Sequence, residues 1–190
     1  MQSTRILFLI EISMLTALAL ALDVIPFLNF KVWAMGGSVS LAMVPVFIAA
    51  FRWGIKGGLL SGFLWGVLQV AVGQAFIVHW AQALIEYGLA FTVIGFAGLF
   101  AGKVKEAVKS GNQKGYLTAI TLGVALGSAL RFLAHYFAGV IFFGSAIESQ
   151  SAWLYSFLYN VSYMVPTAIL SVLVVYFLFR TQPKTLLKAA

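Results

Sequence analysis

The sequence predicts an all-α membrane protein with six transmembrane helices and both termini in the cytoplasm. Composition, continuous apolar runs and the placement of basic residues all support this prediction. Of the 190 residues, 62% are hydrophobic and 9% are charged, whereas soluble domains carry about 25% charged residues. The mean hydropathy of +1.01 also indicates that lipid is the solvent. We therefore expect a single integral membrane domain over residues 1–190.

The apolar residues form six runs separated by short polar segments. A helical span needs about 20 apolar residues, whereas barrel strands alternate over roughly ten. The runs are continuous, so we expect helices; the second is short enough to be tilted or partly interfacial. The first has signal-peptide-like alanine spacing but is longer than a usual signal core, so we expect it to be retained. The runs cover residues 5–24, 40–52, 56–72, 76–102, 116–143 and 153–179.

Basic residues lie almost entirely on one side of the six predicted spans. Only Lys31 falls on the other side, and Arg131 lies inside a span. This bias is typical of cytoplasmic loops and predicts a multi-pass membrane protein with both termini in the cytoplasm. The net charge of +7 therefore requires no nucleic acid. The residues on the cytoplasmic side are Arg5, Arg52, Lys56, Lys103, Lys105, Lys109, Lys114, Arg180, Lys184 and Lys188.

Small residues recur at four-residue intervals in several spans. Such rows let helix backbones approach closely, and we expect internal packing for the glycines. In the first span, Ser13 and Ala17 form a similar row that faces either the bundle or another protein. The glycine rows are Gly54, Gly58, Gly62 and Gly66, then Gly98 and Gly102, then Gly123 and Gly127.

Three spans carry strongly polar residues at one level of the outer half. At 1.5 Å per residue, Glu86 lies about 15 Å below the outer face, Arg131 about 18 Å, His135 about 12 Å and Asn160 about 10 Å. Polar groups in a membrane are costly and mark function. Helical spacing places Glu86 in one stripe with His79 and Gln82. It also forms a stripe of Arg131, His135, Gly139 and Phe143.

This layer predicts a pocket for an aromatic, partly cationic heterocycle. Aromatic faces attract cations, and a carboxylate accepts hydrogen bonds from amino groups. Other interpretations remain open: Glu86 and Arg131 form a structural ion pair, His135 is a packing residue, and Asn160 joins two helices. Aromatic residues near the outer face line the pocket rim or form an interfacial belt. Glu11 is expected to be structural or to contact a partner, and Asp23 to be solvated.

Catalytic and cofactor motifs are missing from the sequence. It contains no cysteine, no metal-binding H-E-x-x-H pattern, no G-x-S-x-G nucleophile turn and no phosphate-binding loop. We therefore expect no enzyme activity and no cofactor. If a binding protein this small drives uptake, it must draw its energy from a partner or an ion gradient.

Four segments carry a resemblance to a known family: Gly62-Phe63-Leu64-Trp65-Gly66, Gln82-Ala83-Leu84-Ile85-Glu86-Tyr87, His135-Tyr136-Phe137-Ala138-Gly139, and Tyr155-Ser156 with Asn160. Through these segments the chain resembles the thiamine-specific substrate-binding subunits, or S components, of energy-coupling factor transporters. This resemblance implies one substrate-binding domain in the bacterial plasma membrane with an outward-facing thiamine pocket, and a transmembrane coupling subunit and two cytoplasmic ATPases as partners.

The resemblance also implies particular contacts. Trp33 and His135 would flank the thiazolium ring, and Ser13 and Ala17 would dock the coupling subunit. Arg131, Phe76 and Phe143 stand where members of the family carry Lys, Tyr and Trp. The residues expected to hold the aminopyrimidine are Glu86, Tyr155 and Asn160, and those completing the site are Tyr87, Arg131, Gly139, Phe143 and Ser156.

Three rival functions remain open from the sequence. In the first, the chain would be a self-sufficient secondary carrier for another cationic heterocycle. In the second, it would be an intramembrane enzyme that uses Glu86 and His135. In the third, it would be a structural subunit that binds no small molecule. The first outer loop, residues 25–39, is the expected cover of the pocket because Gly36 and Gly37 permit motion beside Trp33.

Overall fold

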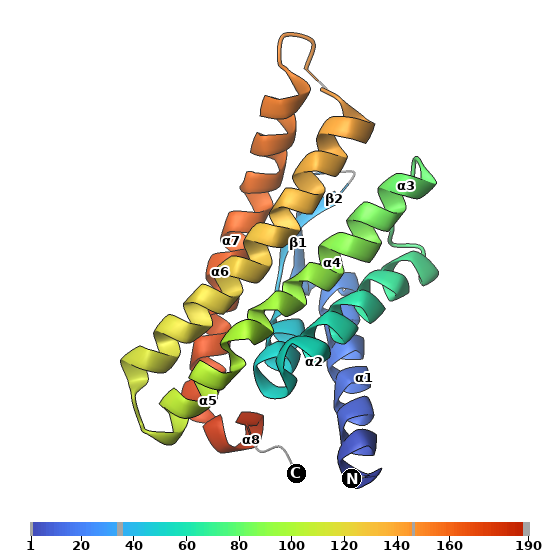
Figure 1. Ribbon diagram of the computed structural model, residues 1–190. Helices are drawn as coiled ribbons and strands as arrows, with labels where there is room; N and C mark the ends of the chain where they lie inside the picture. Colours follow the sequence, from blue (N-terminus) through green and yellow to red (C-terminus); the bar gives the residue numbers. More distant parts are fainter. Residues whose placement is uncertain (1, 34–35, 146, 188–190) are drawn as a thin grey trace.

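The computed structural model is an elongated helical bundle with one β-hairpin along its side (Figure 1). It describes residues 2–33, 36–145 and 147–187, so Lys188 lies outside the described residues, as does the Lys184 side chain. The strands are β1 (Asn29–Trp33) and β2 (Gly36–Ser40). The helices are α1 (Gln2–Val24), α2 (Met43–Ala71), α3 (Trp80–Ala83), α4 (Ala90–Thr92), α5 (Ala101–Lys109), α6 (Gln113–Ala138), α7 (Ala152–Thr181) and α8 (Pro183–Leu187).

The prediction of a helical multi-pass membrane fold is confirmed. Among the described residues, five helices are long and apolar enough to cross a membrane. Two of them combine different helix types. A π-helical stretch, Leu84–Leu89, and a 3-10 stretch, Val93–Phe100, join α3, α4 and α5 into one span, and a π-helical stretch, Gly139–Phe143, extends α6.

The second and third predicted runs are the two arms of α2. Gly54 interrupts the helix with φ 74° and ψ −165°, a conformation that favours glycine. Met43 at the start of α2 and Gln69 near its end line the same cavity, so the chain reverses direction at Gly54. Six apolar runs therefore give six helical arms, although two of them belong to one helix.

The glycine row of α2 brings two spans into backbone contact, which confirms the prediction of internal packing for this row. The same prediction is wrong for Gly102, which is exposed and whose added Cβ would meet no atom within 4 Å. A Cβ atom at Gly62 would overlap the carbonyl oxygen of Phe91, and one at Gly66 would overlap that of Tyr87. Glycine is needed at both positions because the backbones touch. This contact fixes the π-helical stretch that carries Glu86.

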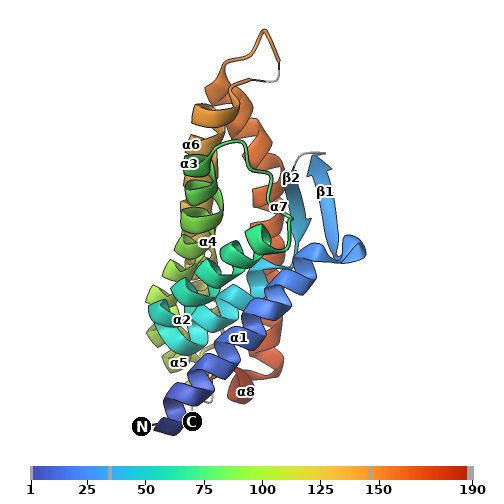
Figure 2. The same cartoon turned by 90° about the vertical axis from the view of Figure 1, so that its right-hand side faces the viewer.

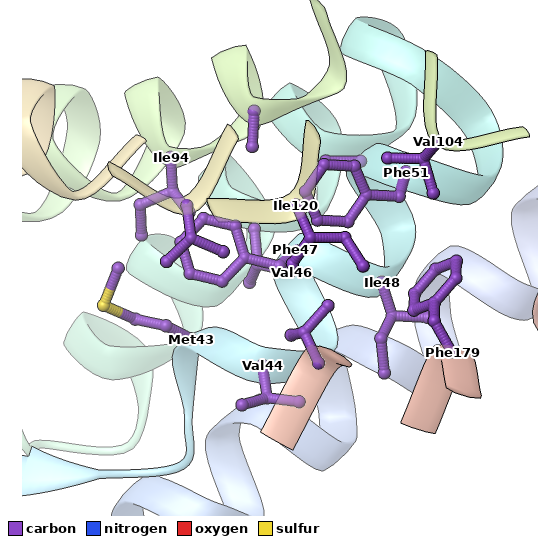
Figure 3. Packing of buried hydrophobic residues seen from close by; sticks show 14 of the residues in the cluster. Met43, Val44, Val46, Phe47, Ile48, Phe51, Ile94, Val104, Ile120 and Phe179 are labelled. Carbon is purple, nitrogen blue, oxygen red and sulfur yellow. The ribbon is translucent and has the colours of Figure 1, made fainter. Parts of the chain in front are cut away.

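The core fills the part of the bundle between the outer cavities and the bend of α2. Figure 3 shows Phe47 and Phe51 from α2 packed against Ile94 and Ile120, with Phe179 from α7 beside them. All five side chains are fully buried. The start of α1 and helix α8 lie at one end of the molecule (Figures 1 and 2). We call the opposite end the outer end, following the distribution of basic residues.

One ion pair near the inner end joins three helices. Arg52 donates from Nε and Nη2 to the Glu11 carboxylate, and from Nη1 to the carbonyl oxygen of Thr185 at 2.7 Å. Trp53 Nε1 donates to the same carboxylate at 2.7 Å. Glu11 therefore has the structural role expected for it, linking α1 to α2 and, through Arg52, to α8.

Candidate functional site

Two adjoining cavities occupy the outer half of the bundle. Their volumes are about 390 and 170 Å³. Most of the predicted site residues line the smaller cavity; Arg131 lines the larger one, and Trp33 lines neither. The residues that line both are Gly36, Gly37, Phe76, Tyr87, His135 and Tyr163.

Glu86 lies on the π-helical stretch Leu84–Leu89. Its carboxylate accepts a hydrogen bond from Nε2 of the fully buried Gln82, and its Oε1 atom is 3.7 Å from Nδ1 of His135. Gln82 also donates to the carbonyl oxygen of Phe76 at 3.0 Å. π-Helical turns are rare and occur often at functional sites. The carboxylate is thus held at the cavity wall by a buried amide and faces an imidazole.

Arg131 packs over aromatic rings instead of pairing with Glu86. Its guanidinium carbon lies 4.5 Å from the ring centre of Phe91 and 5.1 Å from that of Trp65. Its Nε donates to Nε2 of His135 at 3.3 Å. Among the described residues, the basic side chain within 4 Å of the Glu86 carboxylate is that of His135. The alternative of a structural Glu86–Arg131 pair is therefore wrong.

On α7, Ser156 and Asn160 are both buried and hydrogen-bonded. Ser156 Oγ donates to the carbonyl oxygen of Tyr136 at 2.8 Å, while Asn160 Nδ2 donates to that of Ser156 at 2.8 Å. Asn160 Oδ1 accepts from the Tyr163 hydroxyl at 2.7 Å. Gly139 leaves the space that Ser156 occupies, since an added Cβ would overlap Ser156 Oγ.

Tyr155 and Asn160 line the same cavity although ideal α-helical spacing separates their faces. The cavity extends across several residues of α7, and Tyr159 and Tyr163 line it as well. These two tyrosines were missed by the sequence analysis. The four-residue spacing of Tyr155, Tyr159 and Tyr163 was a usable signal for one aromatic stripe.

The structure places Trp33 outside the two cavities. Its Nε1 donates to Ser162 Oγ at 2.9 Å, and its ring stacks on Tyr159 with the ring centres 5.3 Å apart. These contacts hold the indole against the outer part of α7. Its neighbours Gly36 and Gly37 do line both cavities, so the hairpin borders the site even though this side chain does not.

Two further expectations were wrong. Asp23 is not simply solvated: it accepts hydrogen bonds from Gln69 Nε2 and Asn29 Nδ2 and lines the larger cavity. His79 is not part of a helical stripe with Gln82, because it precedes α3 and accepts a capping hydrogen bond from the Ala81 backbone at 3.1 Å. Helix α3 begins at Trp80, later than the apolar run that predicted it.

The arrangement suits a flat organic cation. The carboxylate of Glu86 can accept hydrogen bonds from amino groups, and the rings of Phe76, Phe143 and Tyr159 supply apolar and π surfaces. In the described part of the chain, no three His, Cys, Asp or Glu residues are grouped as metal ligands would be. The site therefore offers a ligand a carboxylate, hydrogen-bonding side chains and aromatic surfaces.

Comparisons with known proteins agree on one family. The family model described as "Thiamine transporter protein" matches residues 9–187. Thiamine transporter ThiT of Bacillus subtilis is 41% identical over 186 residues, covering 97% of this chain and 96% of the relative. ThiT of Lacticaseibacillus paracasei is 28% identical, covering 96% and 92%. The solved structure of ThiT from Listeria monocytogenes matches with a TM-score of 0.90 and 31% identity, covering 97% and 99%.

Proposed function

Because this chain belongs to the thiamine transporter protein family, we propose that it captures thiamine with high affinity at the outer face of the membrane as an S component of an energy-coupling factor transporter. Membership makes it a multi-pass transport protein of the cell membrane and not an enzyme. The observation that carries the proposal is the Glu86 carboxylate 3.7 Å from the His135 imidazole in an aromatic-lined cavity.

The aminopyrimidine ring of thiamine is assigned to the smaller cavity. Glu86 accepts from its amino group, and Tyr155 and Asn160 complete the contacts. The thiazolium ring lies against His135, and Trp33 covers its other face after leaving Ser162. The remaining residues shape the cavity walls or add donors: Tyr87, Arg131, Gly139, Phe143 and Ser156.

Transport energy is assigned to partners. The sequence carries no phosphate-binding loop, so two cytoplasmic ATPases and a transmembrane coupling subunit would supply the driving force. Ser13 and Ala17 are both exposed on α1, while Ile12 and Thr16 face the bundle. That exposed small-residue row is the proposed docking face of the single domain.

The binding test is isothermal titration of the purified protein with thiamine. Glu86→Gln and His135→Ala should each lose about 2 kcal/mol or more of binding free energy, or about 30-fold in Kd, because each leaves a site group without its partner. Glu106→Gln, which changes an exposed glutamate on α5, should bind as wild type does. Unchanged affinity in both site variants would contradict the assignment.

The rival secondary carrier is separated by uptake assays. Proteoliposomes that contain this chain alone should bind thiamine but not accumulate it under a proton or sodium gradient. Accumulation without any partner would show that the chain is a self-sufficient carrier.

A further inference from the structure

The two faces of the β-hairpin differ in character. Side chains alternate between the faces of a strand, and directly paired residues share a face. Asn29 pairs with Ser40 and Lys31 with Ser38, and all four line the larger cavity. The opposite face carries the pair Phe30 and Val39 together with Val32.

The face that points away from the cavity is exposed at Phe30, whereas Val32 and Val39 on the same face are half-buried. Phe30 has 74% of its surface exposed, and Phe27, in the turn Pro26–Leu28 just before β1, has 86%. Figure 2 shows the hairpin at the side of the molecule, rising from the end of α1 beside α7. The exposed phenylalanines therefore lie on the outside of the bundle.

Contacts with α7 place the hairpin at the level of the membrane boundary. The Ser38 carbonyl oxygen accepts from Thr167 Oγ1 at 3.4 Å, and Trp33 bonds Ser162. These α7 residues lie about 15 to 22 Å from its outer end at Ala152. Helix α7 is about 45 Å long and α1 about 35 Å, against a hydrocarbon thickness of about 30 Å. Counted from the inner end of α7 at Thr181, Ser162 and Thr167 lie about 28 and 21 Å along the helix, so the hairpin lies towards the outer edge of the hydrocarbon, where α1 also ends. The outer boundary is therefore lower on α7 than the sequence predicted from Trp153.

The backbone of β1 further restricts the membrane depth at which the hairpin can lie. The sheet has two strands, so one edge of β1 has no strand partner among the described residues. Unpaired strand edges do not occur in the hydrocarbon region, where water cannot satisfy them. The headgroup region, by contrast, supplies water for the edge and an apolar boundary for the phenylalanines.

We propose that the outward face of the hairpin, formed by Phe30, Val32 and Val39 with Phe27 beside it, is a contact surface for the headgroup boundary of the outer leaflet. One face of the same sheet borders the ligand cavity and the other rests on lipid. The bilayer therefore holds the hairpin in place over the cavity. The assignment of this surface rests on the membrane location of the chain and not on the identity of the ligand.

The test uses single introduced cysteines, because the chain has none. Phe30→Cys and the matched control Lys31→Cys, on opposite faces of β1, are each labelled with an environment-sensitive fluorophore and reconstituted in phosphatidylcholine vesicles. Lipid with a nitroxide at the headgroup or upper acyl chain should quench the Phe30 label at least about twofold more than the Lys31 label. Equal quenching, or quenching of the Phe30 label mainly by aqueous iodide, would overturn the proposal.

A protein partner on this face would give a different result. The lipid quenching of the Phe30 label should not change when the ratio of protein to lipid is lowered tenfold. If quenching appears only at the lower ratio of protein to lipid, a second copy of the chain covers this face at the higher ratio. That result would overturn the lipid contact. Thiamine binding by the labelled proteins is measured separately, so a failure of the proposed function does not alter this outcome.

Discussion

At the scale of single residues, the tightest part of the site is the contact between Gly139 and Ser156. Ser156 Oγ fills the space above Gly139 and donates to the carbonyl oxygen of Tyr136, and Asn160 then bonds the Ser156 carbonyl. The Asn160 side chain, which lines the cavity, is thus oriented by Ser156, and Ser156 fits only because residue 139 on the neighbouring helix is a glycine. A methyl group at this glycine would displace the serine and with it the asparagine.

Gly139→Ala should weaken thiamine binding about tenfold. The added methyl group overpacks the contact with Ser156, at a cost of about 1–3 kcal/mol. Ser156 and Asn160 then move to relieve the overlap, and Asn160 is no longer oriented for the ligand. Gly88→Ala is the matched control, since its added Cβ meets no atom within 4 Å. Titration calorimetry on both variants checks the expectation. Equal affinities for the two would show that the contact does not orient Asn160.

At the scale of elements, hydropathy was sufficient to predict the membrane helices but not their internal irregularities. The apolar runs mark segments that partition into lipid, whatever their exact helix type. The reversal at Gly54 falls in the gap between the second and third predicted runs, so hydropathy located it. The π-helical stretches, by contrast, depend on packing between spans, which no local pattern encodes. The depths calculated from the α-helical rise still placed Glu86 and His135 at one level. The π-helical stretches change the rise per residue only slightly, so they hardly alter the depth.

The same limit explains the errors at the site. Trp33 lies on a hairpin whose position depends on Ser162 and Tyr159, residues 129 and 126 positions away in the chain. Asp23 was assigned to solvent from its place at a helix end, but the hairpin folds back over it. Polar residues inside helices were predictable by depth and spacing, whereas side chains on the connecting segments were not.

Gly66→Ala should lower the thermal stability of the protein clearly, by about 1–3 kcal/mol, because its Cβ would overlap the Tyr87 carbonyl oxygen and force α2 from the neighbouring span. Gly102→Ala, with no atom within 4 Å of its added Cβ, should be neutral or slightly stabilising. Thermal unfolding in detergent compares the two. A melting temperature for Gly66→Ala equal to that of wild type would disprove close backbone packing at this point.

At the scale of the whole molecule, the buried charged groups lie towards the two ends of the bundle. The outer end holds the cavities, and the inner end holds the Glu11–Arg52 pair that ties α1, the bend of α2 and α8 together. Arg52 is almost fully buried, and removing one member of such a pair leaves the other charge without compensation.

Glu11→Gln and Arg52→Gln should each destabilise the protein, and the double variant should lose less stability than the two single losses combined. The expected coupling is about 0.5–3 kcal/mol. Melting temperatures of all four proteins in detergent provide the comparison, with Glu106→Gln as an exposed control that should be within about 0.5 kcal/mol of wild type. Strictly additive losses would contradict the proposed role of the pair as a joint between helices.

The buried core has an electrical consequence. Met43 and Trp65 form part of the wall of the larger cavity and belong to the same cluster as Phe47 and Phe51, one and two helical turns further in. Below the cavities, therefore, roughly 12 Å of close-packed hydrocarbon separates the water outside from the inner end. A lone copy of this protein in a planar bilayer should carry no measurable ionic current, and its presence should leave the membrane potential of a cell undisturbed.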